Sequence, residues 1–174
     1  MLGGAKYRFF DTLDRTARLS RTRGNDAMVV GDRHEDFGTL RDRALRLANA
    51  LIALGVGPGT RVGVLMGNRL EWPETLFAVA AAGGVCVPIN VLLRGFEVGY
   101  VLEDSEVAFL VVDGRAEAAL AELPVMPGTV IMVGDVEVPA GIARLLRYED
   151  LVLAGDAVPT GVPIGIEDAV MTYY

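Results

Sequence analysis

The chain has 174 residues, of which 52% are hydrophobic and 22% are charged, and its formal net charge is −7. This composition is typical of a folded globular domain and excludes a disordered, charge-rich chain. A nucleic-acid partner is not expected, because binding phosphates requires clustered Lys and Arg. The single cysteine, Cys86, excludes an internal disulfide and a cysteine-based metal site, and it fits a reducing compartment.

The sequence predicts no transmembrane segment. Its longest apolar runs, 77–82 and 85–90, are far shorter than the ~20 residues that a helix needs to cross a bilayer. Residues 1–8 also lack the apolar core of a secretory signal. We therefore expect a cytoplasmic protein, and a peripheral contact with a membrane surface stays open.

The first predicted element is a helix over 9–21, where apolar residues recur at helical spacing. Residues 27–37 then predict a β-hairpin with a polar tip over 31–36. This tip contains the only histidine, His34. A single histidine cannot form a Ser-His-Asp or Cys/His site by itself, so we interpret His34 as a solvated loop residue.

A second helix is expected from Thr39, which could cap it together with Asp42, to Gly55. The glycines over 55–59 superficially resemble a nucleotide-binding loop. Such a loop follows a strand and opens a helix, so that backbone N–H groups meet the phosphate. Here the glycines follow a helix and precede a strand, which favours a helix cap and a turn.

Apolar strands and amphipathic helices alternate through the middle of the chain. This order is typical of parallel strands with helical crossovers, so we predict an α/β fold with part of a doubly wound sheet over 1–133. The predicted strands lie at 61–66, 85–89, 107–112 and 129–133, and the predicted helices at 70–82, 96–104 and 116–123.

The pattern weakens after the last of these strands. Frequent Gly and Pro over 134–167 predict a loop-rich connector, with one short helix near 141–146. Residues 168–174 then predict the start of a further strand.

Residues that could carry chemistry have simpler interpretations. Cys86 lies between valines in an apolar strand, which indicates a small buried side chain and not a nucleophile. Trp72 is interpreted as an anchor near a helix start. Glu103, Asp104 and Glu106 at a helix end are interpreted as a solvated acidic cap, and Arg41, Arg43 and Arg46 as the polar face of a helix.

Several ordered segments carry a resemblance to a known family. They are Phe-Gly-Thr-Leu at 37–40, Pro-Gly-Thr-Arg-Val-Gly-Val-Leu-Met at 58–66, Ala-Ala-Gly-Gly-Val-Cys-Val-Pro-Ile-Asn at 81–90, and the helix and strand over 100–112. Together they resemble the opening of the adenylate-forming superfamily, which comprises acyl-CoA synthetases, luciferases and the adenylation domains of peptide synthetases. The resemblance implies the N-terminal domain of such an enzyme.

Residues 168–174 resemble the strand that leads into the family's phosphate-binding motif, Tyr-Thr-Ser-Gly-Thr-Thr-Gly-x-Pro-Lys-Gly. Tyr174 matches the first Tyr of this motif, and the residues that follow it in the family are missing from the sequence. The resemblance thus implies Tyr174 as a cofactor-binding residue and implies no catalytic residue and no metal ligand in these 174 residues. ATP, Mg²⁺ and CoA are implied for the intact enzyme, and no cofactor for the fragment.

Within the family, Asn90 followed by Arg94-Gly95 is similar to acyl-CoA ligases, although many of these have Arg at the position of Leu92. The resemblance therefore implies a truncated AMP-forming acyl-CoA synthetase. The intact enzyme would use ATP to convert a carboxylic or fatty acid to an acyl-adenylate and then to acyl-CoA, and the fragment itself is expected to be inactive. The alternative is a stand-alone, non-catalytic binding domain derived from the same fold.

Overall fold

A single parallel sheet organises the chain in the computed structural model, which describes residues 8–20 and 25–174. Its strand order is β4-β3-β5-β6-β7, and every neighbouring pair is parallel. The strands are β3 (Arg61–Leu65), β4 (Val85–Pro88), β5 (Phe109–Val112), β6 (Thr129–Met132) and β7 (Arg144–Arg147).

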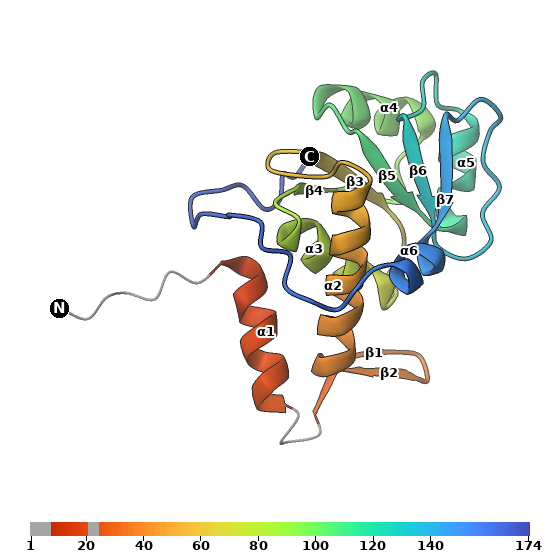
Figure 1. Ribbon diagram of the computed structural model, residues 1–174. Coiled ribbons are helices and arrows are strands. Elements are labelled where there is room, and N and C mark those ends of the chain that lie inside the picture. The colour runs from red at the N-terminus through yellow and green to blue at the C-terminus, as the bar shows by residue number, and fades with distance from the viewer. Residues whose placement is uncertain (1–7, 21–24) are drawn as a thin grey trace.

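Helices cover both faces of this sheet (Figure 1). One face packs against α2 (Phe37–Ala53), α3 (Glu71–Ala81) and α6 (Tyr148–Ala154). The other packs against α4 (Gly95–Asp104) and α5 (Glu117–Ala121), which follows a short 3₁₀ turn, Gly114–Ala116. The predicted α/β fold, with parallel strands and helical crossovers, is therefore confirmed.

The central strand β5 is apolar and buried at every position because each of its faces meets a helical layer. In β5, Val111 joins the core under α2 and α3, whereas Leu110 and Val112 join the core under α4 and α5. The elements predicted between 61 and 133 are present, and their ends differ from the prediction by one or two residues.

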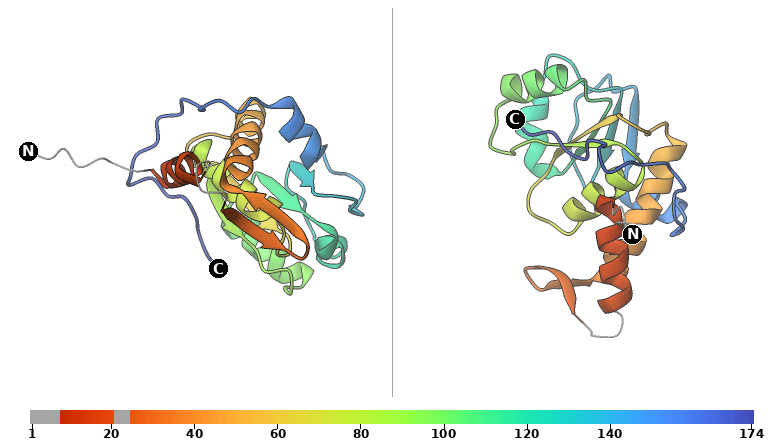
Figure 2. Two further views of the ribbon diagram at one scale, coloured as in Figure 1. Left: turned by 90° about the horizontal axis from the view of Figure 1, so that it is seen from below. Right: turned by 90° about the vertical axis from the view of Figure 1, so that its left-hand side faces the viewer.

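Helix α1 (Phe9–Ser20) and a small antiparallel hairpin, β1 (Asp26–Val30) and β2 (Arg33–Asp36), extend from the sheet domain beside α2 (Figure 2). Leu13 of α1 packs against Leu40 and Ala44 of α2 in a small separate core. The last residue of the helix predicted over 9–21 lies outside the described residues.

The start of α2 differs from the prediction. Asp36 is the cap, and its Oδ1 accepts hydrogen bonds from the backbone N–H groups of Gly38 and Thr39 at 2.7 and 3.1 Å. The predicted capping arrangement of Thr39 with Asp42 is therefore wrong. The hairpin turn falls at Gly31 and Asp32, so the polar residues after it belong to strand β2 and not to a solvated tip.

The segment predicted as a connector over 134–167 holds two regular elements. Residues 144–147 form the edge strand β7, and the helix begins only at Tyr148, so the short helix expected near 141–146 is wrong. The backbone enters the sheet here because β6 offers an open edge for pairing. Glu149 and Asp150 then lie in the first turn of α6, where acidic side chains favour a helix start.

The end of α6 is docked tightly on α2 at Gly155. A Cβ placed on Gly155 would lie 1.9 Å from the carbonyl oxygen of Arg46, so no larger residue fits there without moving backbone. The Arg46 guanidinium in turn donates a hydrogen bond to the Gly155 carbonyl oxygen at 2.8 Å.

We predict that Gly155→Ala lowers the free energy of unfolding by about 1–3 kcal/mol, as overpacking does in other cores. Gly128→Ala is the matched control, because a Cβ there meets nothing within 4 Å, and it should leave stability within about 1 kcal/mol of the parent. Urea unfolding of the three proteins measures both changes. Equal effects of the two substitutions would contradict the packing assigned to Gly155.

Candidate functional site

The sheet topology indicates a candidate site at the carboxyl ends of β3 and β5. The connection after β3 runs to β4 over one face of the sheet, and the connection after β4 returns to β5 over the other face. Since β3 and β5 are neighbours in the sheet, the chain changes direction between these two strands. In open parallel sheets, ligands bind outside the carboxyl ends of the strands at such a switch point. This edge is therefore the first candidate site.

Asp113, which follows β5, organises this edge. Its Oδ2 accepts a hydrogen bond from the backbone N–H of Gly67 at 3.1 Å and lies 3.5 Å from Nη1 of Arg69. Its Oδ1 accepts a further hydrogen bond, from the backbone N–H of Arg115, at 3.1 Å. The polar groups of this edge thus bind one another and hold the loops after β3 and β5 together.

Arg69 extends this network to the start of α3. Its Nε donates to Oε2 of Glu71 at 2.7 Å, and this hydrogen bond raises the pKa of Arg69 despite its partial burial. Burial acts to raise the pKa of Glu71, but the hydrogen bond and charge of Arg69 outweigh it and lower that pKa. Both groups are thus ionised at neutral pH, as a stable ion pair requires.

Residues 168–174 lie beside β4, on its open edge. The Cys86 N–H donates to the Val170 carbonyl at 2.8 Å, and the Thr172 N–H donates to the Cys86 carbonyl at 3.0 Å, which forms one parallel bridge between Cys86 and Met171. The segment therefore takes an edge position in the main sheet, directed parallel to β4.

Tyr174, the binding residue implied by the resemblance, lies at the end of this segment. Its hydroxyl donates to Oδ2 of Asp104, the last residue of α4, at 2.7 Å, and this hydrogen bond raises the pKa of Tyr174. The tyrosine is 54% exposed. The role implied for it stays a prediction, and the observed contact ties the end of the segment to α4.

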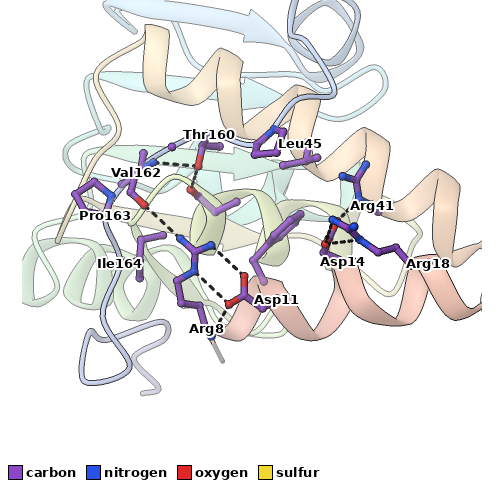
Figure 3. A pocket seen from close by; sticks show the side chains of 14 residues that line it. Arg8, Asp11, Asp14, Arg18, Arg41, Leu45, Thr160, Val162, Pro163 and Ile164 are labelled. Atoms are coloured by element: carbon purple, nitrogen blue, oxygen red, sulfur yellow. Dashed lines mark hydrogen bonds and ion pairs between the residues drawn. The ribbon is translucent and has the colours of Figure 1, made fainter. Parts of the chain in front are cut away.

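A pocket of about 400 Å³ lies elsewhere, between α1, α2 and residues 159–164 (Figure 3). Its charged side chains are all ion-paired, because Asp11 pairs with Arg8 at 3.1 Å and Asp14 pairs with both Arg41 and Arg18, at 2.5 and 2.8 Å. The apolar side of its wall is formed by Phe10, Leu45, Ala81, Pro159, Val162, Pro163 and Ile164. Paired charges and apolar walls do not suit a phosphate ligand.

The sequence interpretation missed a buried polar cluster centred on Glu74 of α3. The Glu74 side chain is 1% exposed, and it accepts hydrogen bonds from Nε of Arg43 and from the hydroxyl of Tyr148, each at 2.8 Å. Nη2 of Arg43 also donates to Glu149 at 2.7 Å. Arg43, predicted on the polar face of its helix, thus joins α2, α3 and α6.

The pKa shifts of Arg43 and Tyr148 agree with this arrangement. Burial acts to lower the pKa of Arg43, but hydrogen bonds to Glu149 and Glu74 outweigh it and raise that pKa, so the cation persists throughout the neutral range. Burial and the neighbouring charge of Glu74 raise the pKa of Tyr148 well above its usual value, so its hydroxyl stays a donor. The cluster is a structural ion pair of a kind that is costly to break.

The remaining candidates lie apart from one another. Cys86 is fully buried, and burial raises the pKa of its thiol to about 12, which agrees with a structural role. His34 is exposed and pairs with Asp26 at 2.7 Å across the hairpin. Trp72 packs against the core under α2 and α3. Among the acids at the end of α4, Glu106 pairs with Arg61 at 2.9 Å.

Residues 8–20 and 25–174 contain neither a metal-binding group nor a membrane-spanning helix. No group of three or more His, Cys, Asp or Glu side chains is arranged to hold a metal ion. Within the same residues, none of the helices has the length and apolar character that a membrane crossing requires.

Comparisons with known proteins identify the class. Residues 14–156 match the family described as AMP-binding enzyme. The chain therefore belongs to the AMP-binding enzyme family, as the sequence resemblance predicted.

Individual relatives agree with this family. The chain is 30% identical over 154 residues to 4-hydroxybutyrate--CoA ligase 2 of Metallosphaera sedula, covering 85% of this chain and 28% of the ligase. It is 33% identical over 136 residues to a nonribosomal peptide synthetase of Aspergillus rugulosus, covering 78% of this chain and 2% of that protein.

Among solved structures, a benzoate CoA ligase from Burkholderia xenovorans superposes with a TM-score of 0.78 and 25% identity. The match covers 95% of this chain and 32% of the ligase. The chain thus spans less than a third of the length of each of these three relatives.

We predict that Arg43→Met lowers the free energy of unfolding by about 3 kcal/mol, because Glu74 would stay buried without its cation. The double variant Arg43→Met/Glu74→Met should recover most of this loss. Arg18→Met is the control, since its ion pair with Asp14 is largely exposed on the arginine side and should cost at most about 1 kcal/mol. Additive effects in the double variant, measured by urea unfolding, would contradict the assigned pair.

Proposed function

We propose that this chain is part of an AMP-forming acid–thiol ligase, which converts a carboxylic or fatty acid to an acyl-adenylate and then to acyl-CoA. Membership in the AMP-binding enzyme family supports this proposal. Two of the relatives reported above are named as CoA ligases and one as a nonribosomal peptide synthetase. Asn90 and the following Arg94-Gly95 favour a CoA ligase within the family.

The described residues do not fit a site for Mg²⁺ or for the phosphates of ATP. No three or more His, Cys, Asp or Glu side chains among them are arranged to hold a metal ion, and the polar groups at the β3 and β5 ends are engaged with one another around Asp113. We therefore assign ATP, Mg²⁺ and CoA to residues that a longer polypeptide would supply, beyond the Tyr174 position. The cofactors provide the phosphoryl chemistry and the acceptor thiol when bound.

The contribution of this chain is then positional. Backbone hydrogen bonds to Cys86 hold residues 170–172 beside β4, and Tyr174 is tied to Asp104. In the proposed enzyme this arrangement fixes the point from which the phosphate-binding loop begins. Positioning of this kind matters because adenylation depends on bringing a carboxylate in line with the α-phosphate. We place the enzyme in the cytoplasm, and the free, buried Cys86 of this chain agrees with a reducing compartment.

The second candidate is a stand-alone binding domain without catalysis. It is favoured by the apolar side chains that α4 and the segment after α5 present to solvent, Phe96, Tyr100 and Val125, each more than half exposed. The coding sequence beyond codon 174 separates the two candidates. A continuation that reads Thr-Ser-Gly-Thr-Thr-Gly is expected for the ligase, and a stop codon would favour the binding domain.

We predict that the 174-residue chain alone releases no pyrophosphate from ATP when it is incubated with Mg²⁺, CoA and a panel of carboxylic acids, because it lacks the phosphate-binding loop. The 4-hydroxybutyrate--CoA ligase of Metallosphaera sedula, supplied with 4-hydroxybutyrate, serves as the positive control. Acid-dependent release above a blank without protein would show that this chain carries its own catalytic residues and would contradict the assignment.

A further inference from the structure

Glu35 of β2 is a buried acid without a conventional partner. The residue is 6% exposed, although its neighbours on the strand, His34 and Asp36, are solvent-exposed. Among the described residues, Oε1 of Glu35 is a buried side-chain oxygen that no N–H or O–H donor reaches. A buried polar atom in this state is costly and calls for an explanation.

The group that Glu35 contacts is another carboxyl, that of Glu74 in α3. Both oxygens of Glu74 already accept hydrogen bonds, one from Arg43 and one from Tyr148. Glu74 is thus the acceptor of the pair, and Glu35, whose Oε1 has no donor, is the side chain that has to supply one. Two ionised carboxyl groups offer only acceptors to each other, so a stable contact requires one proton between them, and that proton belongs on Glu35.

We propose that Glu35 and Glu74 share a single proton, and that loss of this proton loosens the β1–β2 hairpin from helices α2 and α3. When Glu35 carries the proton, its O–H donates to Glu74 and links the hairpin to the centre of the Glu74 cluster. When the proton passes to water, two buried carboxylates repel each other. The hairpin is the smaller and more exposed of the elements that they join, so it is the element that loosens.

Each element packed against the pair contributes other charged groups. These charges change the strength of the interaction between Glu35 and Glu74, but they do not supply the proton that it needs. Arg43 attracts Glu35 from α2, and Glu71 repels it from the start of α3. Arg33, also on β2, is directed to Glu71 at 3.6 Å. The remaining groups nearby are Tyr148 and Glu149 of α6, which bind Glu74 and Arg43, and the pair of His34 with Asp26 on the solvent side of the hairpin.

The expected direction of the pH effect follows from this geometry. Burial, together with the charge of Glu74 and the hydrogen bond to it, raises the pKa of Glu35 from 4.5 to about 7. A folded-state pKa above the unfolded value means that the folded chain holds more protons in this window. The stabilisation is complete below pH 4.5 and is lost as the pH rises through about 7.

The test compares the 174-residue chain with Glu35→Gln, whose amide donates to Glu74 at every pH. Between about pH 5 and about pH 8 we expect the unfolding midpoint of the parent chain to fall by on the order of 5–10 °C, and that of Glu35→Gln to change little. Over the same range, hydrogen exchange at 26–36, corrected for its intrinsic pH dependence, should speed up in the parent only. An equally steep pH dependence in Glu35→Gln would overturn the proposal.

His34→Gln is the matched control, because His34 precedes Glu35 on β2 but lies on the exposed side of the hairpin, where it pairs with Asp26. This variant should keep the pH dependence of the parent. If His34→Gln loses the pH dependence, the effect belongs to His34 and the proposal is overturned. If Glu35→Gln fails to fold, a carbon-13 NMR titration of the Glu35 carboxyl in the parent chain decides. A midpoint near pH 7 supports the shared proton, and one near 4.5 contradicts it.

Discussion

The arrangement of the helices on one face of this protein depends on a single buried carboxylate, that of Glu74. Strand β2, helix α2 and helix α6 all direct a polar side chain toward it from outside its own helix, α3. A carboxylate at this depth is tolerated only while its donors stay in place, so the four elements cannot shift independently without exposing or orphaning a charge. Apolar packing holds the helices on both faces, and the opposite face, under α4 and α5, has no comparable polar cluster among the described residues.

The sequence predicted the sheet well because each central strand is a short apolar run between helices of regular periodicity, and both signals are local. It failed where local patterns allow two structures. The segment Arg144–Arg147 contains paired leucines between arginines, which suit a helix or an edge strand equally, and only the open edge of β6 decides between them. Asp36 and Thr39 are both good cap residues, and the end of β2 selects Asp36.

The polar cluster could not be predicted for a different reason. Glu35, Glu74 and Arg43 each look like surface residues in their own segments. Glu35 and Glu74 are buried, and Arg43 is partly buried, only because distant segments bring them together. A polar residue in an otherwise ordinary pattern carries no local sign of burial. The opposite holds for Tyr174, whose implied role comes from the sequence and not from a contact in the structure. It rests on resemblance to a family motif, and its observed contact with Asp104 neither requires nor contradicts nucleotide binding.

Hydrogen exchange of Glu74→Gln under native conditions tests most directly whether Glu74 couples β2, α2 and α6. This substitution keeps the size of the side chain and removes its charge. We predict faster exchange in 26–36, in the first half of α2 and in 148–154 together, with α4 and α5 unchanged. Faster exchange confined to α3, or an equal change in α4 and α5, would show that Glu74 does not join these elements.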